Sequence, residues 1–136
     1  MLELKDFEEA KKRVDEVIIP TPLIYSPAFS KECRNMVYIK PENLQKTGAF
    51  KIRGAYNKIM KMDDESKSRG LIASSAGNHA QGVAYAAQQL GVKATIVMPA
   101  HTPLIKVDAT KALGAEVVLH GEVYDDAYNK AVELQK

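Results

Sequence analysis

The sequence is poor in cysteine, lacks tryptophan and has no excess of either charge. Its single cysteine, Cys33, excludes an intramolecular disulfide, and we interpret it as a packing residue rather than a nucleophile. Nineteen basic side chains stand against seventeen acidic ones, so the net charge of +2 leaves no basic stripe for nucleic acid or a membrane surface. The charged amino terminus lacks the apolar core of a secretory signal. We therefore expect a cytoplasmic protein without a nucleic-acid or membrane partner.

The composition is that of an ordinary globular chain of 136 residues, of which 46% are apolar and 26% charged. This length forms one modest core, or roughly a third to a half of a two-domain enzyme. The range 70–92 contains no Asp, Glu, Lys or Arg, but its serines, glutamines, asparagine and histidine argue against a membrane span. We predict that this segment is buried and that its polar groups bind partners or a ligand.

The first half of the chain predicts mixed structure. Apolar residues recur at every third or fourth position in two segments and predict helices, whereas a group of prolines favours extended backbone. The expected elements are a helix over 6–17, an extended surface connection over 18–29, a short strand over 36–40, a loop over 41–48, a helix over 50–62 and turns over 62–70.

The second half alternates strands with helices. Strands are expected over 71–73, 93–98 and 116–119, and helices over 78–90, 104–113 and 124–134. Gly91 and Gly114 stand where two of these helices would end in a left-handed residue. This pattern predicts the α/β class, as an open three-layer αβα sandwich with a mostly parallel sheet. Ligands of such sheets bind beyond the carboxyl ends of the strands.

The loop after the first of these strands, residues 74–79, is the main candidate for a binding site. Its small residues let a ligand approach the backbone, and the amides that open the next helix favour an anion. Two interpretations stay open: a cradle for a carboxylate or phosphate, or an ordinary cap in which Ser75 or Asn78 bonds to its own helix. A nucleotide-binding phosphate loop is excluded, because Val83 stands where that motif requires lysine.

Lys51 is the second candidate, because it lies near the start of a predicted helix. A lysine there opposes the helix dipole, so contact with a ligand would explain its position better than a structural role. The alternative is a solvated surface lysine. His101 and His120 have no spacing that suits a metal, and we expect no metal site.

Two segments carry a resemblance that covers the chain from about Phe7 onward. Residues 40–55 read KPENLQKTGAFKIRGA, and residues 73–82 read ASSAGNHAQG. Together they resemble the threonine dehydratase (threonine ammonia-lyase) branch of the fold-type II pyridoxal phosphate enzymes. The resemblance implies a tryptophan synthase β-like fold, pyridoxal 5'-phosphate as cofactor and a homo-oligomer. The implied reaction converts L-threonine or L-serine to 2-oxobutyrate or pyruvate plus ammonia, in either a biosynthetic or a catabolic role.

The same resemblance assigns roles to individual residues. Lys51 would bind the cofactor covalently and later take the proton from the substrate Cα, while Phe50 would border the cofactor ring and Asn78 would bond its phenolic oxygen. The residues that would hold the substrate carboxylate are Ser75, Gly77, Asn78 and His79. Ala76 stands where related serine racemases carry a hydroxyl, so we do not expect racemisation.

The resemblance also divides the chain between two domains. Residues 1–49 would belong to the larger cofactor domain and residues 50–136 to the smaller open α/β domain. The rest of the larger domain, with its glycine-rich phosphate loop, would lie beyond Lys136. We therefore predict an ammonia-lyase of which this chain is the N-terminal part. The alternative is a non-catalytic α/β module that does not turn over substrate alone.

Overall fold

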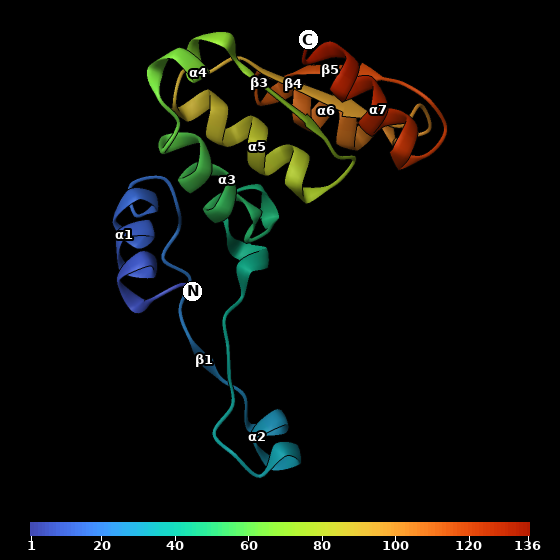
Figure 1. Cartoon of the computed structure of the whole chain (residues 1–136). Coiled ribbons are helices and arrows are strands. Elements are labelled where there is room, and N and C mark those ends of the chain that lie inside the picture. Colours follow the sequence, from blue (N-terminus) through green and yellow to red (C-terminus); the bar gives the residue numbers. More distant parts are fainter.

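A three-stranded parallel sheet forms the centre of the C-terminal half, as Figure 1 shows for this computed structural model of residues 1–136. The strands β3 (Leu71–Ser74), β4 (Ala94–Met98) and β5 (Glu116–Leu119) lie side by side in that order. Each pair is parallel, and Ile96 of β4 is opposite Val117 of β5. The central strand β4 is covered on both faces, which suits its β-branched residues. The prediction of a parallel sheet is confirmed.

Helices cover both faces of this sheet and complete the predicted three-layer arrangement. One face packs against α5 (Asn78–Gln89) and α6 (Leu104–Ala112), and the other face packs against α7 (Tyr124–Leu134). Successive residues of β4 point to opposite faces, because Ile96 joins the core under α5 whereas Val97 packs under α7. None of the helices combines the length and the apolar character that crossing a membrane requires.

The helix α3 (Lys51–Met60) lies beside α5 and buries one face against it. Its buried residues recur at helical spacing and are Ile52, Ala55, Tyr56 and Ile59. α5 meets them with a face rich in alanine and is largely buried between α3 and the sheet. The burial expected for the charge-free range 70–92 is therefore confirmed only in part, because β3 is half-buried and both ends of α5 are exposed. α1 (Leu4–Val14) packs against α3 as well.

Between α1 and α3, residues 23–39 form an arm that extends away from the rest of the chain (Figure 1). Two short strands, β1 (Ile24–Tyr25) and β2 (Tyr38–Ile39), pair antiparallel within it. α2 (Pro27–Cys33) lies between these strands at the end of the arm. Cys33 is exposed there, so its interpretation as a packing residue is wrong.

Two short helices occupy segments for which the sequence predicted extended backbone or turns. α2 begins at Pro27, whose fixed φ suits the first position of a helix, with Ser26 before it. α4 (Asp64–Arg69) follows Asp63, whose side chain accepts a hydrogen bond from the Ser66 amide at 2.6 Å. Both helices depend on single residues at their starts, which an interpretation based on proline content and polarity overlooks.

Candidate active site

Lys51 is the first residue of α3, and its side chain is exposed. The residue before it, Phe50, is exposed too, with an exposed fraction of 58%. The Lys51 amine lies 5.0 Å from the centre of the Phe50 ring, which is the geometry of a cation–π contact. The amine is therefore accessible to a ligand and has an aromatic face beside it.

The predicted loop over 74–79 contains the last residue of β3, the connection over 75–77 and the first two residues of α5, at the carboxyl end of the sheet. α5 begins at Asn78 after an extended Gly77, and no side chain caps it. The Ser75 hydroxyl instead accepts a hydrogen bond from the Gly77 amide at 3.4 Å, before the helix starts. The interpretation of Ser75 or Asn78 as a cap is therefore wrong, and the amides of the first turn stay available to an anion. Ser75 and Gly77 are half-buried, whereas Asn78 and His79 are exposed.

Gly82 lets Lys51 lie directly on α5. A Cβ atom placed on Gly82 would be 3.1 Å from the carbonyl carbon of Lys51 and 3.2 Å from the backbone nitrogen of Ile52. Gly82 follows Asn78 by one helical turn, so both residues share a face of α5. The structure thus brings Lys51 and Phe50 to the first turns of the helix that opens with the candidate loop.

The contact at Gly82 leads to a prediction about stability. Gly82→Ala is expected to lower the free energy of unfolding by about 1–2 kcal/mol, because the added methyl group would lie only 3.1–3.2 Å from backbone atoms of Lys51 and Ile52, which must then shift. Gly54 is the matched control on the facing helix, since no atom lies within 4 Å of its added Cβ. Gly54→Ala should gain about 0.5–1 kcal/mol from helix propensity. Urea unfolding measures both, and equal effects would contradict the close contact.

An ion pair closes the segment that contains Lys51. Arg53 donates from Nε to one carboxylate oxygen of Glu42 at 2.9 Å and from Nη2 to the other at 2.8 Å. Thr21 Oγ1 donates to the same carboxylate at 2.6 Å. The hydrogen bond from Arg53 is the main cause that lowers the pKa of Glu42 from 4.5 to about 2, against an opposing effect of burial. The same bond raises the pKa of Arg53 above its usual value. Both residues lie in the segment 40–55, yet the sequence assigned neither a role.

The lowered pKa of Glu42 sets a pH dependence. Because folding lowers this pKa, the ion pair contributes its full stabilisation above pH 4.5 and loses it as the pH falls toward 2. Discounted for partial exposure of both side chains, the contribution is about 2 kcal/mol at neutral pH. The free energies of unfolding in urea of the wild type and of Glu42→Gln should therefore differ by that amount at about pH 7 and converge only as the pH falls to about 2. A difference that stays constant over this range would contradict the ion pair.

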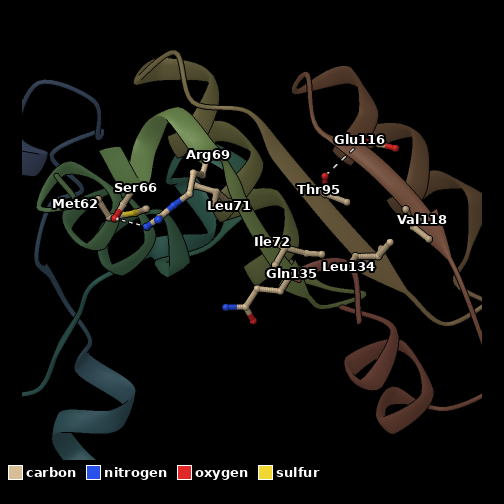
Figure 2. Close-up of a pocket in the computed structure, with 11 residues that line it drawn as sticks. Met62, Ser66, Arg69, Leu71, Ile72, Thr95, Glu116, Val118, Leu134 and Gln135 are labelled. Atoms are coloured by element: carbon tan, nitrogen blue, oxygen red, sulfur yellow. Dashed lines mark hydrogen bonds between the residues drawn. The ribbon is translucent and has the colours of Figure 1, made fainter. Parts of the chain in front are cut away.

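A hollow of about 710 Å³ lies at the opposite end of the sheet, and Figure 2 shows the side chains around it. Its walls include Leu71 and Ile72 at the start of β3, Arg69 of α4 and Leu134 of α7. None of the predicted site residues lines it. Ligands of parallel sheets bind at the carboxyl ends of strands, whereas this hollow lies at the amino ends. Arg69 already pairs with Glu65 at 3.3 Å, and we assign the hollow no catalytic role.

Sequence comparison shows the relatives of this chain. The family described as "Pyridoxal-phosphate dependent enzyme" matches residues 14–136. The L-threonine ammonia-lyase of Thermotoga maritima is 51% identical over 136 residues, which are 100% of this chain and 34% of that protein. The L-threonine dehydratase biosynthetic IlvA of Haemophilus influenzae is 52% identical over 124 residues, which are 91% of this chain and 24% of that protein. The chain thus spans about a third or less of these curated relatives.

Comparison with solved structures agrees with the sequence. The processed form of threonine deaminase isoform 2 from Solanum lycopersicum matches with a TM-score of 0.85 and 41% identity, over 98% of this chain and 38% of that one. Maize serine racemase matches with a TM-score of 0.90 and 34% identity, over 98% and 40% of the two chains. These matches confirm the predicted fold class. The chain belongs to the pyridoxal-phosphate dependent enzyme family, within which its sequence groups with the threonine dehydratases.

Proposed function

We propose that this chain is the N-terminal part of a threonine dehydratase, which converts L-threonine or L-serine to 2-oxobutyrate or pyruvate plus ammonia. The observation that carries this proposal is the contact of Lys51 with α5, a helix whose start no side chain caps. One region thereby offers an accessible amine together with amides that bind an anion. An α-amino acid substrate presents the carboxylate that such amides recognise.

The residues of this region fit pyridoxal 5'-phosphate. Lys51 offers an exposed amine to the cofactor aldehyde, Phe50 offers a ring face beside that amine, and Asn78 stands at the exposed start of α5. The Ser74 hydroxyl is buried at the end of β3 without a hydrogen-bond partner, so a polar group is free near the loop. When bound, the cofactor withdraws electrons from the substrate Cα and makes its proton acidic.

Each of the proposed site residues then has its own task. The Lys51 amine takes the proton from Cα. The Asn78 side chain would hold the cofactor ring in place by a hydrogen bond to the phenolic oxygen of that ring. The substrate carboxylate is held at the helix start by Ser75, Gly77, Asn78 and His79. These residues orient the carboxylate and stabilise its charge, and they transfer no proton.

Elimination rather than racemisation is the reaction that this proposal assigns, although maize serine racemase has a similar fold. Racemisation needs a second acid–base group on the face of Cα opposite the lysine. Ala76 lies in the middle of the loop, is half-buried and carries only a methyl group. The loop therefore offers no hydroxyl at this position to exchange a proton with the second face.

The test is a chimera in which this chain replaces the matching N-terminal part of the Thermotoga maritima L-threonine ammonia-lyase. The chimera is expected to release 2-oxobutyrate from L-threonine, measured with a coupled dehydrogenase, and the intact Thermotoga protein is the positive control. A chimera that folds, as judged by circular dichroism and urea unfolding, but releases no 2-oxo acid from either substrate would support the non-catalytic module.

The organisation of the whole protein is part of the same proposal. Residues 1–49 belong to the larger domain, residues 50–136 form most of the smaller one, and the whole protein is a homo-oligomer. The exposed apolar side chains of the arm support this organisation, since Leu23 is 66% and Phe29 51% exposed in the isolated chain. Sedimentation of the chimera tests it, and a monomer at micromolar concentration would contradict the oligomer.

A further inference from the structure

The segment from Glu42 to Arg53 is a loop that a single ion pair closes. The two bonds between these side chains join residues that are 11 positions apart, and Lys51 lies inside the loop. Hydrogen bonds also connect this ion pair to the segment before the arm. The Thr21 hydroxyl donates to Glu42, and Lys40 Nζ donates to the Thr21 carbonyl at 2.7 Å. A planar guanidinium paired with both carboxylate oxygens fixes orientation as well as distance.

A second set of hydrogen bonds fixes the same loop at Gln45, whose side chain is buried. Its Nε2 donates to the Ile19 carbonyl at 2.7 Å, and its Oε1 accepts from the Ile19 amide at 2.8 Å. The same oxygen accepts from the Lys46 amide at 3.0 Å. One side chain therefore binds the backbone of a distant segment from both sides, immediately before the turn that leads to Lys51.

That turn is strained. Thr47 has a φ of +62° and Gly48 a φ of +68°, and the left-handed region is unfavourable for a β-branched residue such as threonine. The Thr47 hydroxyl is also buried without a hydrogen-bond partner. Both features cost free energy, and such a conformation persists only where the surrounding structure holds it. The hydrogen bonds at Glu42 and Gln45 are the contacts that flank it.

We propose that Glu42, Arg53 and Gln45 are positioning residues for Lys51, which hold the left-handed turn so that the Lys51 amine stays beside the Phe50 ring and the start of α5. This inference rests on the proposed function, in which Lys51 is the reactive amine. The three side chains act through the backbone of the loop and through the first turn of α3. Without them the turn relaxes toward negative φ at Thr47 and the amine loses its fixed place.

The test uses a signal that the amine itself reports. Lysines are converted to ¹³C-dimethyl derivatives, and the Lys51 methyl signal is assigned by its absence in Lys51→Arg. The nearby Phe50 ring should shift this signal upfield, and Phe50→Leu should remove the shift. In Glu42→Gln we expect the Lys51 signal to lose more than half of this upfield shift. In Arg53→Lys, which keeps the positive charge but not the two parallel hydrogen bonds of the guanidinium, we expect a smaller loss.

Asn57→Ala is the matched control. Asn57 lies in α3, as Lys51 does, but away from the turn, and it accepts a hydrogen bond from Arg13 Nη1 of α1 at 3.2 Å. The substitution should lower the melting temperature and leave the Lys51 signal in place. If Glu42→Gln lowers the melting temperature while the signal stays, the ion pair is merely structural and the inference is overturned. Equal loss of the signal in Asn57→Ala would overturn it too. Attachment of pyridoxal phosphate to wild-type Lys51 is a separate readout, so failure of the proposed function remains distinguishable.

Discussion

Lys51→Arg in the chimera is expected to lower 2-oxobutyrate release from L-threonine by about 10³-fold or more. Arginine keeps the positive charge and much of the length of lysine. Its guanidinium does not lose its proton in proteins, so it can neither attack an aldehyde nor take a proton from Cα. The side chain of Lys51 is exposed in this chain, and the substitution should leave urea unfolding unchanged. The rate at saturating L-threonine is the quantity to measure.

Lys46→Arg provides the control for that experiment. Lys46 is also exposed and lies five positions before Lys51. The proposed mechanism gives the Lys46 amine no role. Its rate should stay within about twofold of the unsubstituted chimera. A Lys51→Arg chimera that keeps more than about a tenth of the activity would contradict the assignment of this amine.

Gly77→Val is expected to raise the KM for L-threonine by about 10- to 100-fold, which corresponds to the loss of hydrogen bonds to a charged carboxylate. No atom lies within 4 Å of a Cβ placed on Gly77, so the added side chain enters open space at the helix start, where the carboxylate is proposed to bind. The φ of Gly77 is −137°, an extended value that other residues adopt, so the fold should survive.

Steady-state kinetics and thermal unfolding of the same variant separate the two effects. The expected result is a large change in KM with a shift in melting temperature of only a few degrees. An unchanged KM would place the carboxylate elsewhere, and a collapse of the fold would show that the space beside Gly77 is needed for packing.

The C-terminal half of the fold could be predicted because its local and tertiary signals agree. α7 has the predicted bounds, and Gly91 and Gly114 adopt the left-handed φ values of +64° and +81° expected at helix ends. Strands that alternate with helices leave few arrangements other than a parallel sheet with right-handed crossovers. The N-terminal half has no such repetition, and its short helices start at single residues, α2 at Pro27 and α4 after the capping residue Asp63.

The candidate site could be predicted only in part. Lys51 and the loop over 74–79 have recognisable residues near helix starts, but the contact of Lys51 with α5 depends on Gly82, whose close neighbours are distant in sequence. In the sequence, Glu42 and Arg53 cannot be told from ordinary charged surface residues. Only the fold shows that they pair across a turn. The left-handed Thr47 opposes its local preference, so no propensity predicts the turn itself.

The most direct test is to find where pyridoxal phosphate attaches to this chain. The chain is mixed with the cofactor, reduced with borohydride and digested, and the labelled peptides are identified by mass spectrometry. We predict that the label concentrates on the peptide that contains Lys51 and that Lys51→Ala removes most of it. A label spread over the exposed lysines according to their accessibility, with the same total in Lys51→Ala, would contradict the account.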